Sequence, residues 1–220
     1  MNHVRQALII VAGLSMPGVI VDAAAESQVW TEVGVRHDLS KRLTLTFDQH
    51  LRFDADVSRV GSFMPEPGLA YRVQPWLRAG VGYRLEYERD NGGDLVARHR
   101  LFGWGRVRRD VSDLRLEYRL QLQEQRRADA NPVYRHTVRN RGEVSFRGLR
   151  PVVPAASVEL HHVLGEDGNT AHLGKMWLTV GLEYGRGDLA FDAFYRAEVA
   201  QHDPGDPTVH ILGVGVHYEL

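Results

Sequence analysis

Nine consecutive residues, 114–122, alternate apolar and polar side chains without interruption in the stretch LRLEYRLQL. A β-strand places successive side chains on opposite faces, so this stretch would form a strand with one apolar face and one mostly charged face. A helix would instead distribute both sets of side chains around its circumference. The polar face consists of Arg115, Glu117, Arg119 and Gln121, which are long side chains able to pair with charged residues on neighbouring strands.

The same alternation recurs along most of the chain, in stretches separated by turn residues. Many of these stretches exceed the roughly 9–11 residues that a tilted strand needs to cross a membrane. Strands of soluble proteins average only about 5–6 residues. The pattern therefore predicts an all-β fold, an up-and-down antiparallel transmembrane β-barrel with an apolar outside and a polar lumen. A soluble lipocalin-like barrel is less favoured, because it would need its apolar face inside.

The connections between the predicted strands alternate between tight and longer ones, as in outer-membrane barrels. The count of candidate strands is odd, whereas single-chain bacterial barrels have an even number. We therefore expect about 10 membrane strands, with 12 as the alternative, and residues 28–38 as an accessory strand or a lumen-filling segment. Residues 54–65 are expected to form the longest irregular segment, and Pro154 predicts a bulge or local opening.

The N-terminal residues have the features of a secretory signal peptide. A short N-terminal segment that contains the basic Arg5 precedes a mostly apolar run over residues 7–21, and Ala23-Ala24-Ala25 follows this run. The apolar run is shorter than the roughly 20 residues of a membrane helix. We expect residues 1–25 to be the signal peptide and residues 26–220 to be a single barrel domain. The chain has no cysteine, so no disulfide can form, and its net charge of -1 gives no reason to expect nucleic-acid binding.

Several short motifs resemble a known family of bacterial proteins, and their order spans nearly all of the chain after residue 25. They are Gly82-Tyr83-Arg84, Arg98-His99-Arg100, Arg115 to Arg119, Tyr134-Arg135 with Arg139 and Arg141, Val158-Glu159, Gly181 to Tyr184, and His210 to Val214. Together they resemble DUF2490, a family of uncharacterised outer-membrane β-barrel proteins. The resemblance implies a signal peptide, one barrel and an outer-membrane location in a Gram-negative cell, but no activity. Leu220 departs from the Phe with which such barrels usually end.

The polar faces of the predicted strands hold nine arginines and six glutamates that we expect to line the lumen. These residues are Arg72, Arg78, Arg84, Glu86, Arg115, Glu117, Arg119, Arg135, Arg139, Arg141, Glu143, Glu159, Glu183, Arg196 and Glu198. Charges inside a narrow barrel must be paired or hydrated, and arginine can bind a carboxylate through two hydrogen bonds. We expect a salt-bridged plug, and therefore a structural or narrow-pore role without catalytic activity. The alternative for the same residues is a porin-like polar path for an anionic solute.

An outer-membrane lipid-modifying enzyme, an acyl hydrolase with a Ser/His site on the barrel wall, is the alternative function. Its candidates are Ser157, Glu159 and His161, which share one face of a predicted strand. Ser157 and His161 are four residues apart on that strand, too far for direct proton transfer. Eleven histidines are present, but no metal-ligand spacing recurs. We therefore expect no catalytic, cofactor-binding or metal-binding residues.

The predicted C-terminal strand alternates through residues 212–220. In a barrel, the last strand must pair with the first membrane strand to remove both sheet edges. We expect this strand to be read by the outer-membrane assembly machinery. The other expected partner is outer-membrane lipid, and the barrel is expected to be a monomer.

Overall fold

A computed structural model describes residues 26–53, 59–89, 94–128, 134–166, 171–201 and 208–220 of the chain. The described residues form eleven strands, which follow the alternating stretches of the sequence. The strands are β1 (Glu26–Asp38), β2 (Leu43–Phe53), β3 (Val60–Gln74), β4 (Leu77–Arg89), β5 (Leu95–Val111), β6 (Leu114–Arg127), β7 (Tyr134–Phe146), β8 (Val152–Glu166), β9 (His172–Arg186), β10 (Leu189–Ala200) and β11 (Val209–Glu219). Among the described residues, no helix is long and apolar enough to cross a membrane. The predicted signal peptide, residues 1–25, lies outside the described residues.

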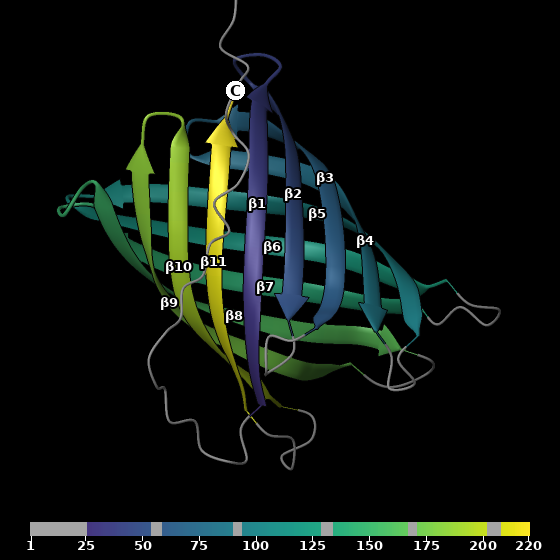
Figure 1. The fold of residues 1–220 in the computed structure, drawn as a ribbon. Helices are drawn as coiled ribbons and strands as arrows, with labels where there is room; N and C mark the ends of the chain where they lie inside the picture. Colours follow the sequence, from purple (N-terminus) through teal and green to yellow (C-terminus); the bar gives the residue numbers. More distant parts are fainter. Residues whose placement is uncertain (1–25, 54–58, 90–93, 129–133, 167–170, 202–207) are drawn as a thin grey trace, which may run out of the picture.

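The eleven strands form one closed barrel in which each strand is hydrogen-bonded to its neighbours in sequence. Successive strands pair antiparallel, which confirms the predicted up-and-down arrangement. The barrel closes between β1 and β11, which pair in parallel from Glu26↔Val209 to Arg36↔Glu219. Figure 1 shows these two strands side by side with their arrowheads pointing the same way. This parallel pairing follows from the odd strand number, because the first and last strands of an odd up-and-down series run in the same direction.

The structure corrects four predictions about the strands. The barrel has eleven strands rather than 10 or 12, and residues 28–38 belong to β1, a full member of the wall. Strand β3 already begins at Val60, so part of the segment predicted to be irregular is paired with β2. Pro154 lies in regular register opposite Leu182, and the irregularity in the β8–β9 pairing falls between His161 and His162 instead.

Most side chains that point out of the barrel are apolar, and most that point into it are polar. On β6, the outward Leu122 is 57% exposed, whereas the adjacent inward Gln121 is only 5% exposed. On β5, where two apolar residues are adjacent, Leu101 is exposed on the outer wall and Phe102 is buried inside. The outer wall is therefore apolar, which is the reverse of a soluble globular barrel.

Exposed aromatic side chains lie toward both ends of the outer wall. Near the tight connections they are Tyr71, Phe146, Tyr184, Phe191 and Tyr218, and near the longer connections they are Phe63, Tyr87 and Tyr134. Valine and leucine side chains make up most of the wall between these levels, which also holds the exposed Tyr83 and Tyr195. Two aromatic girdles flanking an apolar band are typical of barrels that span an outer membrane.

Candidate functional site

One of the two most buried carboxylates in the lumen is that of Glu159 on β8, which is 3% exposed. The Arg139 Nε donates a 2.6 Å hydrogen bond to Glu159 Oε1, and Arg119 Nη2 lies 3.6 Å from the same oxygen. The Nε2 atom of His161 lies 3.7 Å from it. Strands β6, β7 and β8 thus bring two guanidinium groups and an imidazole to one carboxylate oxygen. The pairing compensates the loss of water around a buried charge.

A second buried carboxylate, that of Glu86 on β4, organises the neighbouring part of the lumen. Arg100 Nη2 lies 3.0 Å from Glu86 Oε2, and Arg52 Nη1 lies 3.8 Å from Oε1. The guanidinium of Arg100 also donates to Gln125 Oε1, at 2.8 Å from Nη2 and 3.2 Å from Nε. Here β2, β4, β5 and β6 are connected through one carboxylate and one amide.

Two tryptophans join these polar groups into a layer across the lumen. Trp30 on β1 and Trp177 on β9 meet edge to face, with ring centroids 5.7 Å apart. The guanidinium carbon of Arg196 lies 4.3 Å from the centroid of Trp177, and that of Arg52 lies 4.0 Å from the centroid of Trp30. Cations over indole faces are attracted by the negative potential of the ring. The layer therefore combines apolar volume with bound positive charge inside the lumen.

The layer also contains a lysine–glutamate pair. Glu198 Oε2 accepts hydrogen bonds from Trp177 Nε1 at 2.5 Å and from Lys175 Nζ at 3.0 Å. Trp30, Trp177 and Lys175 were not among the residues predicted to line the lumen. The signal was available, because all three have the inward phase of their strands. The contact between Trp30 and Trp177 could not be predicted from the sequence, because β1 and β9 are not neighbours in the barrel.

The other residues predicted to line the lumen are distributed along its length. Arg84 pairs with Glu66, and Arg141 pairs with Glu143. Near the tight turns, Arg106 Nη1 lies 3.5 Å from Glu117 Oε1, and Arg115 Nε donates to Asp110 at 2.9 Å. Arg196 Nε donates to Thr179 Oγ1 at 2.9 Å. The half-buried Arg78 and Arg135 and the exposed Arg72 and Glu183 complete the predicted set.

The residues considered for acyl hydrolysis do not assemble into a nucleophile and base. Glu159 and His161 are brought together, but the carboxylate is already held by Arg139 and Arg119. Ser157 lies opposite Glu143 and Thr179 on the neighbouring strands. In the part of the chain that the structure describes, Ser157 makes no side-chain hydrogen bond to a histidine.

The outer wall has a groove that the sequence analysis did not anticipate. It has a volume of about 470 Å³ and is lined mainly by apolar side chains of β4 to β8, among them Leu101, Leu122 and Leu164. The same groove includes Glu124 and His136, whose Oε2 and Nδ1 atoms lie 3.6 Å apart. It lies toward the longer connections, where β6 ends and β7 begins.

The fold and lumen define a class of protein, a closed up-and-down β-barrel with an apolar wall and an ion-paired interior. The sequence matches the family described as "Protein of unknown function (DUF2490)" over residues 27–208, and the chain belongs to this family. Among solved structures, LpxR from Salmonella typhimurium has a similar fold, with a TM-score of 0.51 and 13% sequence identity. The similarity covers 80% of this chain and 83% of that chain. Comparison with curated protein sequences found no match.

Proposed function

We propose that this protein is an outer-membrane β-barrel whose lumen is closed by ion-paired side chains, so that its role is structural rather than that of an open pore. The observation that carries the proposal is the layer around Glu159 and Trp177, which is buried inside a wall that is apolar on its outside. The apolar outer wall supports the location, and the similarity to LpxR supports the barrel fold. We further propose that residues 1–25 are a cleaved signal peptide and that the barrel is a monomer.

The energetics of the lumen favour a closed state. Opening a path through the layer would require separating Glu159 from Arg139 while both remain in the confined interior. Breaking a buried ion pair by removing one partner costs about 3–5 kcal/mol, because an uncompensated charge is left behind. The cation–aromatic contacts of Trp177 add to this cost, each by roughly 0.5–2 kcal/mol. Spontaneous opening to a conducting state is therefore disfavoured.

Planar-bilayer recording tests this proposal. The folded protein should produce no large ohmic steps, whereas Trp177→Ala, which removes the indole at the centre of the layer, should produce small ones. Phe146→Ala is the matched control, because it removes an aromatic ring from the outer wall and should leave the bilayer silent. Folding of each sample would be checked by the difference in gel migration between boiled and unboiled protein. Large steps from the unmodified protein would refute the closed lumen.

A second candidate function is action on a membrane lipid at the groove of the outer wall. Its apolar lining suits an acyl chain, and the His136–Glu124 pair places a histidine with a carboxylate beside that lining. Histidine is the side chain that most often serves as a general base. Incubation with radiolabelled phosphatidylethanolamine in mixed micelles would reveal this function as released fatty acid. Release should be lost in His136→Gln. It should be kept in the control His99→Gln, which changes an outward histidine outside the groove. If the unmodified protein releases no fatty acid, this candidate function is ruled out.

A further inference from the structure

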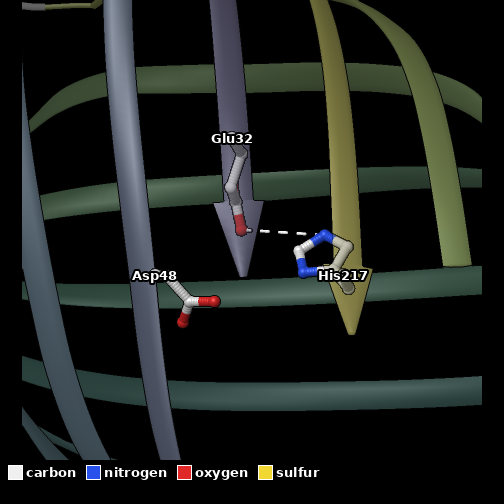
Figure 2. A group of neighbouring side chains, drawn as sticks. All are labelled: Glu32, Asp48 and His217. Carbon is white, nitrogen blue, oxygen red and sulfur yellow. Dashed lines mark ion pairs between the residues drawn. The ribbon is translucent and has the colours of Figure 1, made fainter. Parts of the chain in front are cut away.

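Three side chains meet in the lumen at the place where the barrel closes. Glu32 comes from β1, Asp48 from the adjacent β2, and His217 from β11 on the other side of the closure (Figure 2). One ligand atom from each residue lies within 4.8 Å of the other two. The sequence alone shows no metal-ligand spacing here, because these residues lie on separate strands and are distant in sequence.

The imidazole of His217 is oriented by a carboxylate. Its Nε2 atom lies 3.1 Å from Asp192 Oδ1 on β10, while its Nδ1 atom is buried and has no hydrogen-bond partner among the described residues. Donation from Nε2 to Asp192 leaves Nδ1 with a free lone pair. A histidine held by a carboxylate through one nitrogen, with the other nitrogen free, is the arrangement that orients metal-binding histidines.

The second unpaired atom lies close to the first. Asp48 Oδ1 is also buried and has no hydrogen-bond partner in the described structure. Both atoms lie beside Gly34 on β1, where a Cβ would overlap them. The absence of a side chain at Gly34 therefore leaves space for these two atoms to lie close together. Buried polar atoms of native proteins are nearly always satisfied, so a pair of unsatisfied atoms at one point needs an explanation.

Glu32 is positioned by a hydrogen-bonded chain of its own. Its Oε2 lies 3.0 Å from His50 Nδ1, and His50 Nε2 lies 3.3 Å from Arg84 Nη2. The arginine can only donate, so His50 accepts through Nε2 and donates through Nδ1 to Glu32. The other oxygen, Oε1, lies 3.8 Å from His217 Nε2. Figure 2 shows the carboxylates of Glu32 and Asp48 and the imidazole of His217 pointing toward one another.

We propose that Glu32, Asp48 and His217 bind a divalent transition-metal ion such as Zn²⁺ across the closure of the barrel. Imidazole nitrogen together with carboxylate oxygen suits Zn²⁺, whereas Ca²⁺ and Mg²⁺ take oxygen ligands. The two carboxylates would balance the charge of the ion, and Nδ1 of His217 and Oδ1 of Asp48 would gain the partner they lack. Zinc–ligand distances are about 2.0–2.2 Å, so the three side chains would move slightly inward on binding.

Equilibrium dialysis of the folded barrel in detergent against Zn²⁺, followed by metal analysis, tests the site directly. We expect one tightly bound equivalent in the unmodified protein. Asp48→Asn and His217→Gln should each weaken binding at least 10-fold, and Asp192→Asn, which acts by positioning His217, should weaken it by roughly 10–100-fold. His210→Gln is the matched control, because it removes an outward histidine far from the cluster and should leave binding unchanged.

A glycine substitution separates this site from adventitious binding by surface histidines. Gly34→Ala keeps every ligand but fills the space between Asp48 Oδ1 and His217 Nδ1, so it should abolish the tight equivalent. Gly142→Ala makes the same chemical change at a place where a Cβ meets nothing within 4 Å, and it should bind Zn²⁺ normally. Each variant must first show the folded, heat-modifiable form, which migrates differently on a gel before and after boiling. If Gly34→Ala does not fold, the binding measured for Asp48→Asn and His217→Gln decides whether the proposed site exists. The proposal is overturned if the unmodified protein binds no Zn²⁺, or if the two ligand variants bind it as tightly as His210→Gln does.

Discussion

Glu159 is the residue on which the pairing of the lumen depends most directly. We predict that Glu159→Gln lowers the stability of the folded barrel by about 3–5 kcal/mol, because Arg139 and Arg119 would lose their common carboxylate while remaining largely enclosed. Glu183→Gln makes the same change at an exposed position and should alter stability by less than about 0.5 kcal/mol. Urea unfolding in detergent, followed by tryptophan fluorescence, measures both. Equal effects of the two substitutions would show that Glu159 is not a central partner in the network.

At this scale the sequence predicts the direction of a side chain but not its partner. Alternation placed Glu159, Arg139 and Arg119 on polar faces, and the structure has them in the lumen. Their meeting depends on strand register, because Glu159 lies opposite Arg141 in the ladder yet bonds the neighbouring Arg139. The cluster of Glu32, Asp48 and His217 depends on the closure of the barrel, which no local pattern encodes.

Two arginine substitutions on strand β6 test which face of the strand points out of the barrel. On the proposed outer-membrane location, we predict that Leu116→Arg prevents folded protein from accumulating there, because arginine on the apolar outer wall would face lipid at a cost of about 2–4 kcal/mol near the midplane. Gln121→Arg should be tolerated much better, because Gln121 faces a lumen that already holds arginine–carboxylate pairs. Immunoblots of unboiled outer-membrane fractions would measure the folded form. Similar levels of both variants would contradict the assignment of the apolar face to lipid.

The elements themselves were largely predictable, because alternation reports strand phase residue by residue. It becomes ambiguous where two apolar residues are adjacent, as at Leu101 and Phe102, and only the packed structure shows that Phe102 turns inward. Alternation also does not reveal pairing, so Val60 to Pro65, which lack a strong pattern, were assigned to a loop although they pair with β2. Pro154 was expected to disturb β8, but the strand keeps its register there.

For the whole molecule, the number of strands was the main error of sequence reasoning. The sequence contained eleven alternating segments, but the expectation of an even number led us to set residues 28–38 aside. An odd barrel can close if its first and last strands pair in parallel, and β1 and β11 do so over eleven residue pairs, from Glu26↔Val209 to Arg36↔Glu219. A closure of this kind depends on strands from opposite ends of the chain, so it cannot be read from either segment alone.

The parallel closure makes the C-terminal strand essential to the whole barrel. Val216 lies opposite Val33 of β1 and Phe191 of β10, and the Leu220 N–H donates a 2.8 Å hydrogen bond to the Arg36 carbonyl oxygen. We predict that deletion of residues 216–220 abolishes the heat-modifiable form, because it exposes strand edges of both β1 and β10, which a membrane cannot satisfy. The Leu220→Phe substitution leaves the backbone pairing intact and should preserve or improve assembly. Fractionation with unboiled gels measures both, and a truncated chain that still reached the outer membrane as a folded barrel would contradict the role of this closure.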